Sequence, residues 1–198
     1  MRIGIFGGTF DPPHLGHLIL ASEAHHQCQL DRVLWVLTPH PPHKPDQPIT
    51  PLEVRLAMVQ ACIADAPEFE LSTVDMDRPP PHYAVDTVQF LRAQHPQADL
   101  LYLMGSDSLL NLHTWHRPLD FIRGCDGIGV TRRSDEEIDL PALEARLPGL
   151  AGKVQFVVSM ILGISSTEIR HRLRSGGPVR YYVHPKVYKL LREQKLYA

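Results

Sequence analysis

The sequence predicts a single α/β domain, residues 1–198, built on a doubly wound parallel sheet with helices on both faces. Short apolar runs of strand length alternate with segments of helical periodicity, and such alternation is typical of parallel sheets joined by right-handed crossovers. A glycine-rich turn joins the first run to the segment after it. The length of 198 residues suits one domain. Together these observations indicate a Rossmann-like fold.

Six runs are expected to form the strands because each is short, mostly apolar and bounded by turn or helix signals. They are Arg2–Phe6, Arg32–Leu37, Phe69–Thr73, Leu100–Met104, Gly127–Thr131 and Val154–Val158.

The first strand leads into a turn, Gly7 to His17, and then into apolar helical periodicity from Leu18. Glycines in such a turn let backbone N–H groups approach an anion closely. The helix N-terminus that follows adds further N–H donors and a partial positive charge. The segment therefore predicts a phosphate cradle, whose residues are Gly7, Gly8, Thr9 and Phe10.

Two histidines, His14 and His17, lie three residues apart at the mouth of this cradle. We expect both in the first helical turn, on one face and directed toward the anion. Imidazoles donate hydrogen bonds to phosphate oxygens and, when protonated, offset charge that develops in a transition state. Gly16 lies between the two histidines and has no side chain, so it leaves room for a ligand or for the close approach of another backbone segment. The spacing indicates chemistry on a phosphoryl group.

Further along the chain, Leu52–Ile63 and Ala84–Gln94 have helical periodicity. Two proline-rich stretches, Pro39–Pro51 and Arg78–His82, interrupt the pattern and are expected to be loops, because proline donates no backbone hydrogen bond and disfavours helix before it. Lys44, in the first loop, is expected to reach a phosphate. A metal site on the neighbouring histidines is disfavoured because no carboxylate or cysteine completes a ligand set.

The turn Gly105–Ser108 follows the fourth strand, as Gly7 to His17 follows the first. Ligands of open α/β sheets bind beyond the carboxyl ends of the strands, where the strand order reverses. The two turns are therefore expected to face one cleft. Asp107 is either a turn residue or a ligand contact, and Trp115 is either a buried aromatic or a stacking platform.

The segment Ile164–Arg170 predicts a helix capped by Ser165 or Ser166, with Arg170 one turn in. It is either an ordinary capped helix or a second anion site beside the cradle. From Ile164 to the end of the chain there are eight Lys or Arg and two Asp or Glu, a balance of +6 in a chain of net charge −2. The basic side chains behind this excess either form a solvent-exposed helix face or belong to a triphosphate site.

Composition excludes several classes of protein. No apolar run approaches the length of a membrane span and none resembles a signal peptide, so we expect a cytoplasmic protein that binds no membrane. A net charge of −2 disfavours a general nucleic-acid binder. The three cysteines, Cys28, Cys62 and Cys125, lack the number and spacing of a disulfide framework or a zinc site. We expect no metal held by the protein alone.

Several segments together resemble the bacterial nicotinate-nucleotide adenylyltransferase family, of the His-x-Gly-His nucleotidyltransferase superfamily. The resemblance runs from Met1 to Leu196 and rests on Gly7–His17, Pro41–Lys44, Tyr83–Thr87, Gly105–Leu109, Thr114–Arg117 and Ile164–Arg170. Ala84 departs from it, because the family has a hydroxyl residue there. A side-chain contact from this position is lost, but a backbone contact is not.

The resemblance implies ATP-dependent adenylyl transfer to nicotinate mononucleotide, in the synthesis of NAD. It assigns His14, His17 and Arg170 to catalysis. ATP and phosphate binding would fall to the cradle, Lys44, Gly105, Asp107, Ser165, Ser166 and Thr167. Acceptor binding would fall to Tyr83, Ala84, Thr87, Trp115 and His116, with Trp115 stacked on the pyridine ring. Mg²⁺ is expected to enter with ATP, held mostly by phosphates and water.

Other functions remain open at this point. The acceptor could instead be nicotinamide mononucleotide or phosphopantetheine, although Trp115 and the Pro41–Lys44 loop disfavour the latter. A non-catalytic nucleotide sensor is the alternative from another class, but such a protein would be expected to lose His14, His17 or Arg170. The sequence does not determine the oligomeric state, and a homo-oligomer is one of the alternatives.

Overall fold

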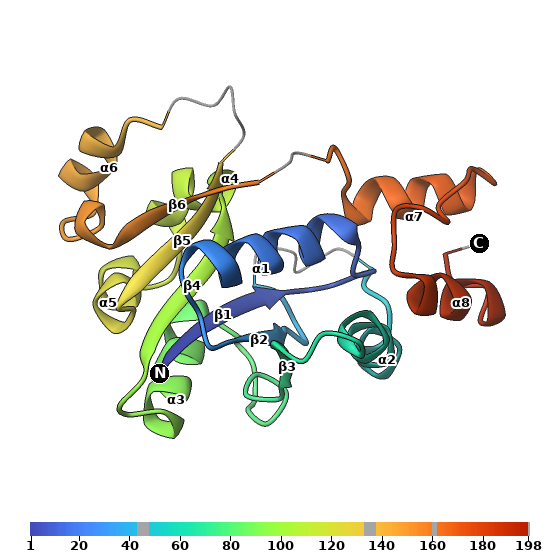
Figure 1. The fold of residues 1–198 in the computed structure, drawn as a ribbon, viewed down its shortest axis with the longest axis horizontal. Helices are drawn as coiled ribbons and strands as arrows, with labels where there is room; N and C mark the ends of the chain where they lie inside the picture. The colour runs from blue at the N-terminus through green and yellow to red at the C-terminus, as the bar shows by residue number, and fades with distance from the viewer. Residues whose placement is uncertain (43–47, 133–137, 160–161, 198) are drawn as a thin grey trace.

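The computed structural model describes residues 1–42, 48–132, 138–159 and 162–197. In this part of the chain six parallel strands form one sheet with the order β3-β2-β1-β4-β5-β6 (Figure 1). The strands are β1 (Arg2–Gly8), β2 (Arg32–Leu37), β3 (Phe69–Ser72), β4 (Asp99–Gly105), β5 (Gly127–Arg132) and β6 (Val154–Val158). The predicted doubly wound sheet is confirmed.

Eight α-helices and two short 3-10 turns complete the described elements. They are α1 (Leu15–Gln27), α2 (Leu52–Ile63), α3 (Ala84–Gln94), α4 (Ser106–Leu110), η1 (Leu112–Thr114), α5 (Pro118–Gly124), α6 (Leu140–Arg146), η2 (Ala151–Lys153), α7 (Ser166–Arg174) and α8 (Pro185–Glu193). The predicted bounds of β2, β6, α2 and α3 are confirmed. Strands β1, β4 and β5 are longer than predicted, and β3 is one residue shorter.

Alternate residues of the strands supply two hydrophobic cores, one on each face of the sheet. In β2, for example, Leu34 and Val36 enter one core, whereas Val33, Trp35 and Leu37 enter the other. Helices α3, α5 and α6 contribute side chains to the first core, and α1, α2, α7 and α8 contribute side chains to the second. In Figure 1, α1 crosses the face of the sheet, whereas α7 and α8 lie to one side of it. Both faces are thus buried, as the near-continuous apolar strands predict.

The order of the strands determines where a ligand site is expected in this fold. From β1 the chain builds the sheet outward through β2 and β3, and then returns to the other side of β1 with β4. The carboxyl ends of β1 and β4 therefore lie side by side at the switch point, where open α/β sheets bind ligands. No helix in the described residues is both long enough and apolar enough to cross a membrane.

Candidate active site

Two adjoining cavities open at the switch point between β1 and β4. The first, here called the aromatic cavity, has a volume of about 420 Å³ and includes Trp115 in its wall. The second, the polar cavity, has a volume of about 480 Å³ and includes His14 and Arg170. Among the described residues both cavities are lined by Thr9, His17 and Ser108. The predicted single cleft is therefore confirmed, as two chambers that meet at these three residues.

The β1–α1 turn forms the floor between the chambers. Gly7, Gly8 and Thr9 line the aromatic cavity. The ring of Phe10 does not; it is 2% exposed and packs against Phe6, with ring centroids 5.4 Å apart. A Cβ atom on Gly8 would lie 2.8 Å from this ring, so only glycine fits there. Phe10, predicted to bind phosphate, is therefore not among the described residues that line either cavity.

His14 and His17 stack on one another at the start of α1, with ring centroids 3.6 Å apart and 24° between the planes. The helix begins at Leu15, and His14 precedes it as the N-cap residue with extended backbone. The prediction that His14 lies in the first helical turn is therefore wrong. The reason is local, because the His14 backbone N–H donates to Nδ1 of His17 at 3.1 Å, as in a capping box. A Cβ on Gly16 would lie 3.1 Å from the His14 ring, so the glycine makes room for this stack.

The same hydrogen bond decides which nitrogen of His17 carries the proton. Because Nδ1 accepts from the His14 backbone, the neutral ring is protonated at Nε2 and offers that N–H to a ligand. Burial lowers the pKa of His14 to about 4. Burial and the neighbouring His14 hold the pKa of His17 well below its ordinary value. Of the two roles expected for these rings, the free protein therefore supports neutral hydrogen-bond donation.

Helix α7 directs its N-terminus at the polar cavity. Ser165 is the N-cap, and its hydroxyl accepts from the Glu168 N–H at 3.1 Å, so the choice between Ser165 and Ser166 is settled. Ser166 Oγ and Arg170 Nη1 donate to backbone carbonyls of the β1–α1 turn, at 2.9 and 2.7 Å. Arg170 Nη2 also donates to Thr167 Oγ1 at 3.3 Å. These bonds bring the predicted second anion site against the cradle.

The β4–α4 turn closes the chambers from the other side. Gly105 lines the aromatic cavity, and a Cβ there would meet nothing within 4 Å, so space beside it is free for a ligand. Asp107 is exposed and lines the polar cavity. Lys44, predicted to reach a phosphate, lies outside the described residues.

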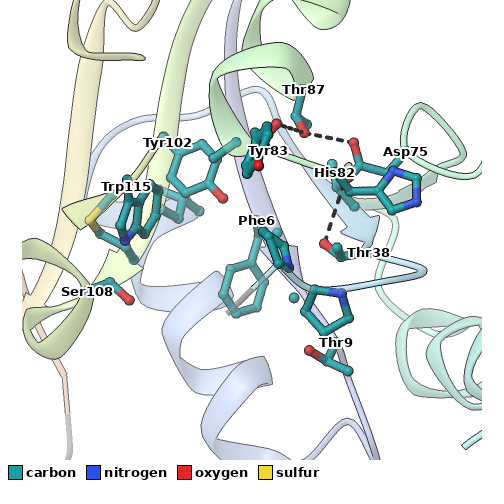
Figure 2. Close-up of a pocket in the computed structure, with 18 of the residues that line it drawn as sticks. Phe6, Thr9, Thr38, Asp75, His82, Tyr83, Thr87, Tyr102, Ser108 and Trp115 are labelled. Carbon is teal, nitrogen blue, oxygen red and sulfur yellow. Dashed lines mark hydrogen bonds between the residues drawn. The ribbon is translucent and has the colours of Figure 1, made fainter. Parts of the chain in front are cut away.

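Trp115 combines the two roles that the sequence left open. It packs against Tyr102 and Phe121 of the core, with ring centroids 6.0 and 5.3 Å apart. It is also half-buried and forms a wall of the aromatic cavity (Figure 2). The core contacts therefore fix a ring that remains available to a planar ligand.

Two further predicted residues, Tyr83 and His116, stack with ring centroids 4.1 Å apart and 21° between the planes. This contact joins the N-terminus of α3 to the turn that carries Trp115. The backbone N–H groups of Ala84 and His116 donate no hydrogen bond to any described residue. They are donors that a carboxylate at the end of the cavity could use.

Thr87 was predicted to bind the acceptor, but its hydroxyl is engaged by the protein. It donates to Oδ1 of Asp75 at 2.7 Å (Figure 2). Arg78 Nη2 donates to the same oxygen at 2.9 Å. Asp75 and Arg78 form an ion pair with side chains 3% and 9% exposed. Arg78 also donates to the Tyr83 carbonyl at 3.3 Å. This pair, which the sequence reasoning missed, holds the first turn of α3 at the cavity.

Arg55 of α2 is a second missed residue. It is 2% exposed, and its guanidinium donates to four backbone carbonyls, those of Thr9, Thr38, Pro39 and Thr50, at 2.8–3.0 Å. The cation thereby ties the phosphate turn to both ends of the loop that follows β2. Its position in an apolar helical pattern, where a charge must find partners, was a signal that could have identified it.

Asp11 is likewise buried, with 5% exposure. Its carboxylate accepts hydrogen bonds from the Tyr197 hydroxyl and, at 3.3 Å, from the Thr50 N–H. Burial and the bond to Asp11 raise the pKa of Tyr197, so this phenol remains protonated. The C-terminal segment thus supports the turn that bears the histidines, a contact that no local pattern indicates.

Comparison with known proteins places this geometry in context. Residues 5–172 match the cytidylyltransferase-like family model. A probable nicotinate-nucleotide adenylyltransferase of Thermomicrobium roseum is 42% identical over 196 residues, which cover 99% of this chain and 91% of the relative. Its counterpart from Thermus thermophilus is 39% identical over 199 residues and the full length of both chains.

Two solved structures of the Plasmodium falciparum nicotinic acid mononucleotide adenylyltransferase share the fold. The one complexed with NaAD has a TM-score of 0.81 at 18% identity and covers 99% of this chain and 97% of its own. The one complexed with APC has a TM-score of 0.78 at 19% identity, with 99% and 96% covered.

Proposed function

The chain belongs to the cytidylyltransferase-like family and, within it, to the nicotinate-nucleotide adenylyltransferases, and on this premise we infer that it transfers the adenylyl group of ATP to nicotinate mononucleotide. The products are nicotinate adenine dinucleotide and pyrophosphate, in the synthesis of NAD. The observation that carries this proposal is the meeting of the two cavities at His17. One cavity offers helix N–H groups and Arg170 to a triphosphate, and the other offers Trp115 to a pyridine ring.

In the proposed reaction a phosphate oxygen of the acceptor attacks the α-phosphorus of ATP in line. A new P–O bond forms, the bond to the β-phosphate oxygen breaks, and pyrophosphate leaves with the bonding electrons. Such chemistry depends mainly on positioning and on stabilising developing charge. The Nε2–H of His17 lies where the chambers join and would donate to the transferred phosphate, with His14 stacked behind it.

The triphosphate tail would lie in the polar cavity, against Ser166, Thr167 and Arg170. We propose that Mg²⁺ enters with ATP and offsets the charge of the phosphates. Among the described residues two carboxylates, Asp11 and Asp107, line this cavity, but that of Asp11 is engaged by Tyr197 and Thr50. This leaves phosphate oxygens and water as the main ligands, a coordination that Mg²⁺ commonly adopts. The reaction is proposed to take place in the cytoplasm, where ATP is available.

The nicotinate carboxylate would meet the N–H groups of Ala84 and His116. An amide presents its own NH₂ group there, so one donor would face another and remain unpaired. We therefore expect a preference for the acid over the amide of at least ~10²-fold in kcat/KM. Because Ala84 would act through its backbone, its missing hydroxyl does not remove this discrimination.

Pyrophosphate release from ATP, measured with nicotinate mononucleotide, its amide and phosphopantetheine, tests the proposal. Rapid release with the acid alone is the expected result. Comparable rates with acid and amide would make the protein a dual-specificity enzyme. Absence of release with every acceptor, from a folded protein supplied with Mg²⁺, would overturn the assignment.

A further inference from the structure

Hydroxyl groups line both cavities, and their hydrogen bonds divide them into two sets. Five of these Ser and Thr side chains bond to the protein within the described residues: Thr38, Thr87, Ser165, Ser166 and Thr167. The hydroxyls of Thr9 and Ser108 bond to no described residue. These two are also the hydroxyl residues that line both chambers. The hydroxyls without a partner among the described residues thus lie where the chambers join.

Ser108 approaches the junction from the side opposite to Thr9. It belongs to α4, directly after β4, whereas Thr9 and His17 belong to the turn and helix after β1. Figure 2 shows Ser108 and Thr9 coming from different elements on either side of the site. Because β1 and β4 are neighbours in the sheet, a phosphate held at the junction would have one hydroxyl on each flank.

We propose that Ser108 is a further substrate-contacting residue, whose hydroxyl donates a hydrogen bond to the phosphate of the acceptor as it attacks ATP. This inference rests on the proposed function and extends it to a residue that the motifs did not single out. Cradle donors surround a phosphate from the β1 side only. A donor on the β4 side would restrain the attacking oxygen laterally, which matters because reactivity depends on alignment.

The test compares Ser108→Ala with Ser108→Thr, which keeps the hydroxyl. A hydrogen bond to a charged group is strong, so Ser108→Ala is expected to lower kcat/KM for nicotinate mononucleotide by roughly 10- to 100-fold. Ser108→Thr should remain within about threefold of the unmodified protein. The dissociation constant of ATP, measured by calorimetry, should be unchanged in both. Ser175→Ala, at the end of α7 and outside both cavities, is the matched control.

Three outcomes would overturn the proposal: unchanged kinetics in Ser108→Ala, equal losses in the Ala and Thr variants, or a loss confined to ATP binding. Thermal unfolding of each variant separates these results from misfolding. Failure of the proposed function is a distinct result, because the unmodified protein would then release no pyrophosphate with nicotinate mononucleotide.

Discussion

The two cavities have similar volumes, about 480 Å³ for the polar cavity and about 420 Å³ for the aromatic one, but they are built differently. The polar cavity is formed mainly by the β1–α1 turn and the start of α7, two contiguous segments in which neighbouring residues act together. The aromatic cavity draws its walls from the ends of β1, β2 and β4, the start of α3 and the turn after η1.

This difference predicts that the two cavities respond to different kinds of substitution. In the polar cavity the donors are backbone N–H groups and side chains whose places follow from local capping, such as Ser165 and His17. In the aromatic cavity the partners are held by contacts between distant segments, such as the Tyr83–His116 stack and the Asp75–Thr87 bond. Substitutions in the polar cavity should act on turnover or on ATP binding, and those in the aromatic cavity on acceptor binding.

The largest expected effect is that of His17→Ala on turnover. Loss of a donor to developing charge costs ~10²–10³-fold in kcat, about 2.7–4 kcal/mol. Steady-state kinetics should show this loss, while calorimetry shows ATP binding within a few-fold of the unmodified protein. Near-normal turnover in a folded variant would remove His17 from the mechanism.

The buried His14 should make stability depend on pH. Its pKa is about 4 in the folded protein and near the ordinary 6.5 in the unfolded chain. Between these values the unfolded state binds the proton and the folded state does not, so the free energy of unfolding falls as pH drops through this window, by up to ~3 kcal/mol.

Urea unfolding at about pH 7 and about pH 4.5 measures this dependence. His14→Gln removes the titrating group, so its stability should fall less between the two conditions. Equal losses in the variant and the unmodified protein would show that other groups account for the effect.

Arg55→Met should destabilise the protein by about 2 kcal/mol or more, because it leaves one buried and three part-buried carbonyls without their donor. Since Arg55 joins the phosphate turn to the loop after β2, kinetics with both substrates should also deteriorate. Chemical denaturation checks the stability, with the exposed Arg192→Met of α8 as the control. An unchanged unfolding midpoint would mean that water satisfies these carbonyls.

Arg170→Lys is expected to weaken ATP use about tenfold, since an ammonium does not reproduce the planar fork of a guanidinium. AMP lacks the tail that Arg170 would contact, so its binding should change little. Calorimetry with both nucleotides compares the two losses. Equal weakening of ATP and AMP would place Arg170 away from the triphosphate tail.

Trp115→Ala gives the smallest expected effect, a rise of about five- to tenfold in KM for the acceptor, because stacking contributes on the order of 1 kcal/mol. The KM for ATP should stay close to its original value. The ratio of acid to amide kcat/KM should also persist, because the discrimination comes from backbone donors. Loss of that ratio would assign selectivity to the ring itself.

The amino-acid sequence by itself determined the fold class, the six strands to within two residues, the bounds of α2 and α3, and the polar half of the site. These features depend on short-range physics: strand and helix periodicity, glycines where a turn is crowded, and Ser165 as a cap. His14 is the exception, because its backbone bond to His17 starts the helix one residue later.

Only the tertiary structure decided the rest. It lowered the pKa values of both imidazoles and recruited Arg55, the Asp75–Arg78 pair and Tyr197 as supports. It also left the Ser108 hydroxyl at the junction with no bond to a described residue. Desolvation and long-range hydrogen bonds depend on which segments the sheet order brings together. That order places residues far apart in the chain around one phosphate-sized space, and no local pattern encodes it.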